Sequence, residues 1–254
     1  MVIQVKWGSF GPVHMATMVL AAAMITALYY VLRHKSMKTK TWVLGVLSFS
    51  GIGAIIFNLV MWDSPLEYLP LHLCSINAML LPVVVFTRNK TLGNLLLVWS
   101  LGALAALVLN FEMTNVDLFS ATFFFYYFPH VMECGIPLLL FKLGMIEKDY
   151  RCIGSTLSIT MLTYTLVHLC NKLINWYCVV NHVVDGGGNV IRVNYMFSVA
   201  ATNPLTAVFY KVIPMEYWYM YMILPILAVY LLAVYAPQLI RGHHKNKMRH
   251  RYAV

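Results

Sequence analysis

Seven apolar segments, each close to 20 residues long, follow one another along almost the whole chain and constrain its fold more than any other feature. They cover residues 12–32, 42–62, 69–86, 91–109, 118–141, 153–180 and 215–236. A helix of about 20 residues spans the roughly 30 Å hydrocarbon core of a bilayer. The sequence therefore predicts an all-α polytopic membrane protein, with one seven-helix domain over residues 1–254 that ends in a basic tail, 237–254.

The composition agrees with this prediction and excludes a soluble domain. Hydrophobic residues make up 61% of the chain and charged residues only 11%, whereas soluble domains have about 25% charged residues. The net charge of +9 comes from cations in short runs between apolar segments, so no nucleic-acid partner is expected. The first apolar segment ends in Arg33-His34-Lys35 rather than in small residues, so we expect a retained helix and no removable signal peptide.

Basic residues predict the orientation, because lysine and arginine are enriched in cytoplasmic loops. The loops 33–41, 87–90 and 142–151 and the tail from Arg241 hold 14 of them, and the alternate loops hold 3. The N-terminus is therefore expected outside and the C-terminus in the cytoplasm, in a bacterial cell membrane or, in a eukaryote, the endoplasmic reticulum. The tail is interpreted as an anchor, with binding of anionic lipid headgroups as the alternative.

The one long connection, 181–214, is predicted to lie outside. It begins with a flexible turn at Gly186-Gly187-Gly188. The stretch Val193–Phe197 that follows is too apolar for a free loop. We expect it to pack back on the bundle.

Polar side chains inside the apolar segments are the first functional candidates, since a charged group near the bilayer midplane costs at least about 2.5 to 3.5 kcal/mol. They are His14, Asn58, His72, Cys74, Asn77, Asn110, His130, Glu133, His168, Asn171 and Lys172. Most fall in the outer half of their segments. This favours one polar cavity open toward the outer leaflet, with unrelated interhelical hydrogen bonds as the alternative.

Cys74 is the candidate nucleophile. The five cysteines are odd in number and lie mostly within apolar segments, so a disulfide framework is not expected. Cys74 follows Pro70 at the start of a predicted helix, where the positive end of the helix dipole favours a thiolate. Asn77 shares its helix face, whereas His72 does not.

His130 is the candidate base from another helix. Pro129 precedes it and predicts a local kink, and Glu133 lies one turn later and can tune it. A cysteine and a histidine within hydrogen-bond reach form an activated nucleophile suited to acyl transfer through a thioester. Asn77, Asn110 and Asn194 are candidate oxyanion donors, and His14 and His72 are assigned to packing and orientation in the cavity.

Two other classes of protein remain open. His72-Leu73-Cys74 recurs as His168-Leu169-Cys170, which suggests soft metal ligands, although residues two apart on a helix point away from each other. The alternative function is therefore a transporter or metal carrier that uses His72, His130, Glu133 and His168. A receptor-like bundle has the right topology but no supporting motif, and no cofactor is expected.

Four motifs resemble a known family. The sequence Leu69-Pro70-Leu71-His72-Leu73-Cys74, the histidine after an aromatic-proline stretch, Gly11-x-x-His14 and Asn194-Tyr195-Met196-Phe197 resemble the bacterial YwaF-like integral membrane proteins. These are relatives of animal transmembrane protein 164. The similarity extends over about residues 10–235. One departure is Ser198–Pro204, which stands where the familiar form continues into a short Lys-Pro stretch.

The resemblance implies an activity. The animal relative is a cysteine-dependent acyltransferase that moves an acyl chain from a phospholipid to a lysophospholipid, and its cysteine and histidine match Cys74 and His130. The expected function is therefore phospholipid acyl transfer through a thioester, with phospholipid and lysophospholipid as substrates. Donor and acceptor specificity need not follow from the resemblance.

Overall fold

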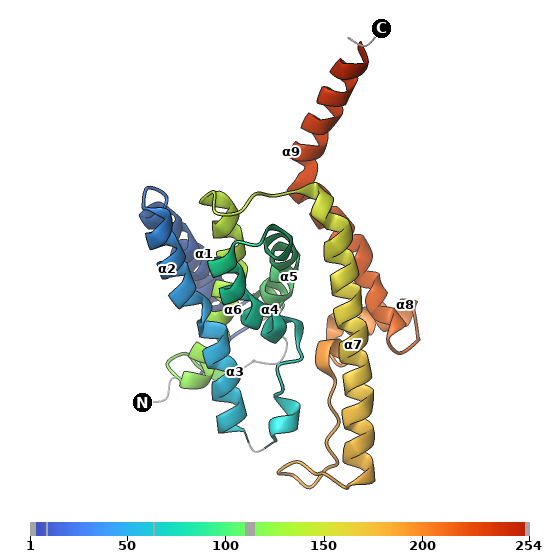
Figure 1. Ribbon diagram of the computed structural model, residues 1–254. Coiled ribbons are helices and arrows are strands. Elements are labelled where there is room, and N and C mark those ends of the chain that lie inside the picture. The colour runs from blue at the N-terminus through green and yellow to red at the C-terminus, as the bar shows by residue number, and fades with distance from the viewer. Residues whose placement is uncertain (1–3, 9, 63, 110–114, 252–254) are drawn as a thin grey trace.

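The computed structural model describes residues 4–8, 10–62, 64–109 and 115–251, with side chains up to residue 240. Within these residues the chain is almost entirely helical (Figure 1). The α-helices are α1 Pro12–Leu32, α2 Met37–Ser48, α3 Ser50–Met61, α4 Leu73–Thr87, α5 Lys90–Val108, α6 Ala121–Lys142, α7 Ile153–Val180, α8 Pro204–Val212 and α9 Ile223–Arg251. The short elements are 3₁₀ turns η1 Pro65–Glu67, η2 Tyr150–Cys152, η3 Tyr195–Phe197 and η4 Trp218–Met222, and strands β1 Gln4–Lys6 and β2 Asn115–Asp117.

Among the described residues, six helical stretches are long and apolar enough to cross a membrane. They are Pro12–Leu32, Met37–Met61, Lys90–Val108, Ala121–Lys142, Tyr150–Val180 and Trp218–Ile240. An integral, multi-pass membrane protein is thus supported. The remaining predicted segment, 69–86, contains α4, which has only 15 residues.

Helix α4 is short because the chain enters it without helical structure. Residues 69–72 lead from η1 into the helix, and α4 begins only at Leu73. Its 15 residues are about 22 Å long, and residues 69–72 before it form bends and turns, with Leu71 N donating to Leu69 O at 2.7 Å. The helix alone is therefore shorter than the roughly 30 Å hydrocarbon core, and a crossing here also needs the turn that precedes it.

Capping side chains explain where several other helices begin. The Ser36 side chain accepts a hydrogen bond from Thr39 N, so α2 starts earlier than the predicted residue 42. Ser120 caps α6 in the same way. The helix therefore begins at Ala121, three residues after the predicted start at 118. Asn203 forms a capping box with Thr206 and begins α8, a helix that the apolar pattern did not predict.

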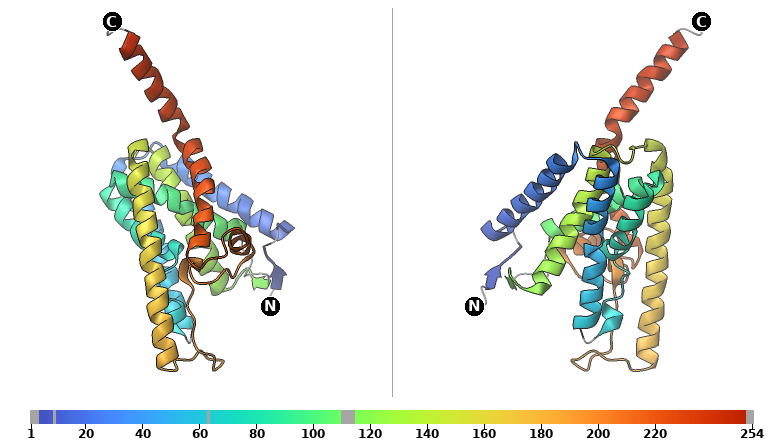
Figure 2. Two further views of the ribbon diagram at one scale, coloured as in Figure 1. Left: turned by 90° about the vertical axis from the view of Figure 1, so that its right-hand side faces the viewer. Right: turned by 60° about the vertical axis from the view of Figure 1, so that its left-hand side comes forward.

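The centre of the bundle is formed by α5 and α6, each more than half buried along its apolar stretch. Trp99 and Leu95 of α5 pack with Ile136 and Leu140 of α6 in the main hydrophobic cluster. Figure 2 shows α1 on one side of this pair and α7 with α9 on the other. The antiparallel strands β1 and β2 join the segment before α1 to the segment before α6.

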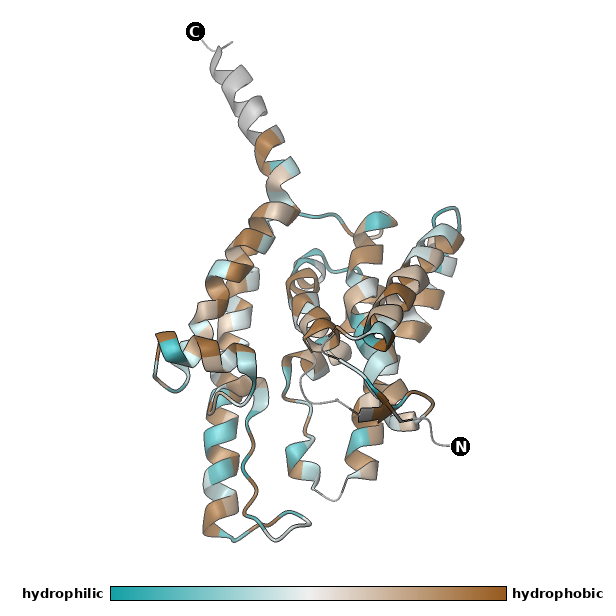
Figure 3. Cartoon of the chain, turned by 180° about the vertical axis from the view of Figure 1, so that it is seen from behind, coloured by the Kyte–Doolittle hydropathy of each residue, from teal (hydrophilic) through white to brown (hydrophobic). Residues whose placement is uncertain are grey.

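The two ends of the bundle differ. The connections 33–36, 87–89 and 143–149 lie at the upper end in Figure 1, toward which α9 also runs, and we call this the basic end. Residues 64–68 and 181–193 lie at the opposite end. Hydrophobic residues predominate along the helices, and hydrophilic residues are frequent on the connections (Figure 3). This distribution agrees with a bundle that crosses a bilayer from one end to the other.

Candidate functional site

Cys74 lies in the first turn of α4, directly after the non-helical segment. His72 is the residue before the helix and Leu73 the first helical one, so Cys74 is at the second position. Its side chain is half-buried and its sulfur forms no disulfide. The thiol therefore lies in the first turn, at the positive end of the α4 dipole.

His130 lies in the middle of α6 and its ring is fixed by the turn before it. Its Nδ1 is 2.6 Å from the carbonyl oxygen of Tyr126. Because a carbonyl only accepts, Nδ1 carries the proton, and the neutral ring has its lone pair on Nε2. The ring also packs on Tyr126 with centroids 4.7 Å apart. This tautomer is the one that a general base working through Nε2 needs.

Glu133 is one turn after His130 on α6 and lies near the other candidate residues. Its side chain is 3% exposed, and its carboxyl is within electrostatic range of both His130 and Cys74 and lies beside Asn77. Oε2 has no hydrogen-bond partner among the described residues. An unpaired carboxylate in such surroundings is costly, so Glu133 is suited to stabilise a positive charge when one forms nearby.

Asn77 is fully buried in α4, and neither its Oδ1 nor its Nδ2 has a hydrogen-bond partner among the described residues. Buried amides are usually bonded, so an unused donor of this kind is available to a substrate. Helix α3 closes this side of the site. A Cβ atom at Gly51 would lie 2.5 Å from Ala78 Cβ and 3.3 Å from Glu133 Oε1, so glycine permits the close approach.

The entrance to α4 is held by η3. Tyr195 is 1% exposed, and its hydroxyl donates to the carbonyl of Leu66 and accepts from Leu69 N at 3.2 Å. Met196 N donates to His72 Nδ1 at 3.4 Å. Burial raises the pKa of Tyr195 to about 12, so its hydroxyl keeps the proton that it donates. The prediction that 193–197 packs back on the bundle is confirmed.

The other predicted site residues lie elsewhere. His14 is fully buried, donates from Nε2 to Leu107 O at 2.7 Å and accepts from Phe10 N at 3.2 Å, so it joins α1 to α5. Asn194 uses its amide within its own loop, with Val199 N and Ala200 as partners. Asn110 is outside the described residues.

The polar residues of α7 form a separate group. His168 Nδ1 is 3.1 Å from Ser198 Oγ, and Asn171 Nδ2 donates to the same oxygen at 2.8 Å. Lys172 pairs with Glu216 at 2.9 Å. The predicted polar side chains are thus divided among α1, the α4–α6 contact and α7, and do not form a single hydrogen-bonded set. In the part of the chain that the structure describes, no three His, Cys, Asp or Glu side chains are grouped as metal ligands.

Sequence reasoning missed several residues at these contacts. Ser198 is fully buried between His168 and Asn171, and Tyr217 closes over His168 with ring centroids 5.0 Å apart. The sequence did carry one signal of this polar group. His168 and Lys172 are four residues apart, which places both on one face of α7.

Comparison with known proteins gives a family. The model described as TMEM164 family matches residues 9–235. The match includes Cys74, His130 and all of η3, and it confirms the resemblance inferred from the four motifs. No curated protein and no solved structure matches the chain.

Proposed function

We propose that this chain, which belongs to the TMEM164 family, is a membrane lipid acyltransferase that works through a thioester on Cys74. The observation that carries the proposal is the position of Glu133, whose carboxyl is within electrostatic range of both the Cys74 thiol and the His130 ring. The cysteine-dependent acyl transfer of the animal relative supports the same pair. The substrates are a phospholipid donor and a lysophospholipid acceptor.

The first half of the reaction forms the acyl-enzyme. His130 Nε2 takes the proton of the Cys74 thiol, and the thiolate attacks the carbonyl carbon of an acyl ester. The resulting imidazolium is stabilised by the carboxylate of Glu133. The tetrahedral intermediate collapses as its C–O bond breaks, and His130 gives the proton to the leaving lysolipid hydroxyl. The acyl chain remains on Cys74 as a thioester.

The second half releases the chain to an acceptor. A lysophospholipid hydroxyl loses its proton to His130 and attacks the thioester carbon. The C–S bond breaks, and the proton returns from His130 to the Cys74 sulfur. Asn77 Nδ2 is the donor best suited to the oxyanion in both halves, because it is buried in the same helix and otherwise unused.

The end of the bundle opposite the basic end is proposed to face the outside. In this arrangement, α4 with the turn before it is the third of seven crossings, and the N-terminus lies outside. Non-helical backbone at membrane depth is tolerated where protein covers it or where it lines a cavity. Residues 69–72 are covered by η3 in this way.

Labelling of the acyl-enzyme tests the proposal. Purified full-length protein incubated with a phospholipid labelled in its acyl chain is expected to gain a label that hydroxylamine removes. Cys74→Ala should lose the label completely. Cys170→Ala is the matched control, because Cys170 is also half-buried but lies on α7. This variant should retain the label. A hydroxylamine-sensitive label on Cys74→Ala would show that the proposal is wrong.

A further inference from the structure

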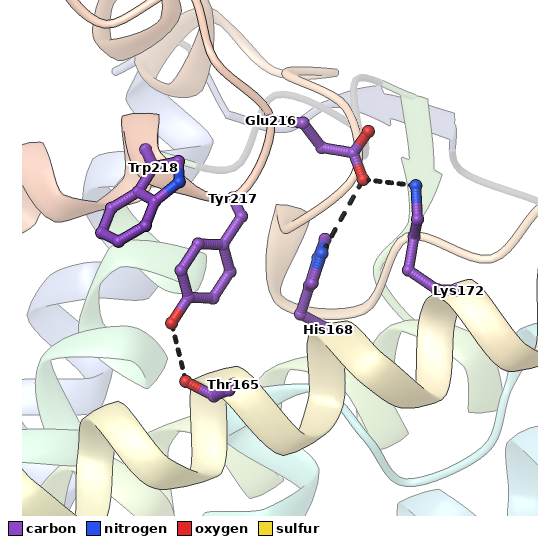
Figure 4. A pocket seen from close by; sticks show the side chains of 6 residues that line it. All are labelled: Thr165, His168, Lys172, Glu216, Tyr217 and Trp218. Atoms are coloured by element: carbon purple, nitrogen blue, oxygen red, sulfur yellow. Dashed lines mark hydrogen bonds and ion pairs between the residues drawn. The ribbon is translucent and has the colours of Figure 1, made fainter.

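A polar pocket lies between α7 and the segment that leads into η4, away from Cys74. Its volume is about 470 Å³, and its lining residues are Thr165, His168, Lys172, Glu216, Tyr217 and Trp218. Figure 4 shows the charged side chains on one side and the two aromatic rings on the other. The acyl-transfer steps use none of these residues.

Both signs of charge are present in this pocket. Glu216 Oε1 accepts from Lys172 Nζ at 2.9 Å and is 3.8 Å from His168 Nε2. The side chains of Lys172 and Glu216 are 55% and 41% exposed. An ion pair this exposed contributes little to stability. A ligand with one negative and one positive group can therefore break this ion pair. Its negative group would then pair with Lys172 and its positive group with Glu216.

Aromatic rings form the wall of the pocket opposite the carboxylate (Figure 4). The Tyr217 and Trp218 ring centroids are 5.1 Å apart, and those of Trp218 and Tyr221 are 5.3 Å apart. Half of the Trp218 surface is exposed. Faces of tyrosine and tryptophan bind ammonium and quaternary ammonium groups, and the carboxylate on the opposite wall supplies a negative charge to the same pocket. The pocket thus offers a place for a cationic group beside one for an anion.

Tyr217 is held in an unusual conformation. Its φ is 68°, a region that bulky residues rarely adopt. Its backbone N donates to Ser198 O at 3.1 Å, and its carbonyl accepts from Tyr164 OH at 2.8 Å. Its hydroxyl is 2.7 Å from Thr165 Oγ1. Strain of this kind persists only where the surroundings enforce it, so this aromatic wall is preformed.

The depth of the pocket fits a lipid headgroup. Lys172 is 19 residues beyond Ile153, the first residue of α7, or about 28 Å along the helix axis. This is close to the roughly 30 Å thickness of the hydrocarbon core. Toward the basic end, α7 and α9 enclose a groove of about 490 Å³ lined only by apolar residues, among them Leu157, Leu224 and Leu231. A headgroup in the pocket would have an apolar path for an acyl chain along the same two helices.

We propose that this pocket binds the zwitterionic headgroup of a phospholipid, with its phosphate on Lys172 and His168 and its ammonium on Glu216, Tyr217 and Trp218. This inference rests on the proposed function and gives its phospholipid substrate a headgroup site. The pocket also connects to the entrance of α4. His168 contacts Ser198 directly after η3, and η3 contacts His72 two residues before Cys74.

Equilibrium binding to the purified full-length protein in detergent tests the proposal. The probes are dihexanoyl phosphatidylcholine and dihexanoyl phosphatidylglycerol, which share chains and phosphate but differ in the ammonium group. Phosphatidylcholine is expected to bind about tenfold more tightly. Glu216→Gln should abolish this preference, and Trp218→Leu should weaken phosphatidylcholine binding about tenfold. Trp176→Leu, which changes an equally exposed tryptophan of α7 outside the pocket, should leave it unchanged.

Several results would overturn the inference. Equal affinity for the two lipids, or an unchanged preference in Glu216→Gln, would exclude ammonium recognition. Equal losses in Trp218→Leu and Trp176→Leu would indicate a general interfacial effect of tryptophan. Competition by soluble glycerophosphocholine at the same concentration as the lipid would exclude a lipid-specific site. Cys74→Ala should bind phosphatidylcholine like the unmodified protein, so headgroup binding is measured separately from acyl transfer.

Discussion

Glu133 is the residue whose position demands a function most clearly, because a buried carboxyl with an unbonded oxygen is costly to keep. As a positioning residue it acts through His130. Glu133→Gln keeps the shape and removes the charge. We expect kcat of acyl transfer to fall about 100-fold, at the lower end of the range typical of general acid–base contributions, while KM stays unchanged.

The control for this substitution is Glu147→Gln, which neutralises an exposed glutamate at the basic end. It should retain full activity. Thermal unfolding of each variant shows whether the fold is intact. A Glu133→Gln protein with unaltered kcat, or one in which only KM rises, would remove Glu133 from the proposed mechanism.

At the residue scale, the sequence identified the polar side chains whose burial costs free energy, but not the groups that they contact. Cys74, Asn77, His130 and Glu133 stood out because polar groups are expensive in apolar segments. His14 met the same criterion, yet its ring joins two helices through Leu107 O. Whether a buried polar group serves the fold or a substrate depends on contacts between distant segments, which no local pattern contains.

At the scale of elements, η3 determines where α4 begins. The Tyr195 hydroxyl bonds to both Leu66 O and Leu69 N, and Tyr195→Phe removes both bonds while the ring remains. Leaving these buried groups unpaired should cost about 1–3 kcal/mol in free energy of unfolding. Acyl transfer should also fall, because Cys74 depends on the same entrance.

Tyr177→Phe is the matched control, since its side chain is half exposed and no hydrogen bond of its hydroxyl is found among the described residues. Denaturant titration in detergent measures the loss for both variants. If Tyr195→Phe is as stable as Tyr177→Phe, η3 does not hold the entrance of α4.

The apolar pattern predicted most helices well. It failed where apolar residues are not helical and where a helix begins inside a stretch that was interpreted as a loop. Segment 153–180 matches α7 at both ends, because polar residues bound it, Arg151 just before it and Asn181 directly after it. Residues 69–72 are as apolar as a helix but precede α4 without helical structure, a possibility that Pro70 signals and hydropathy does not. The start of α8 was signalled by Asn203-Pro204, a capping pair inside a stretch read as a loop.

For the whole molecule, the six long spans leave the number of crossings dependent on α4. If α4 and the turn before it cross the membrane together, connections 33–36 and 87–89 lie on one side and residues 181–193 on the other, in agreement with their positions in Figure 1. From the 14-to-3 distribution of basic residues we then expect the basic end in the cytoplasm.

Cysteine labelling in intact cells tests this topology, in a background with the five native cysteines replaced. Gly187→Cys lies in the exposed turn of 181–194 and should react with a membrane-impermeant maleimide from outside. Ser36→Cys and Asn89→Cys, exposed on two connections of the basic end, should react only after the cells are permeabilised. Labelling of Asn89→Cys but not Ser36→Cys in intact cells would mean that the segment containing α4 does not cross. The entrance to Cys74 would then be a re-entrant loop, because only a crossing brings residue 89 to the same side as residue 36.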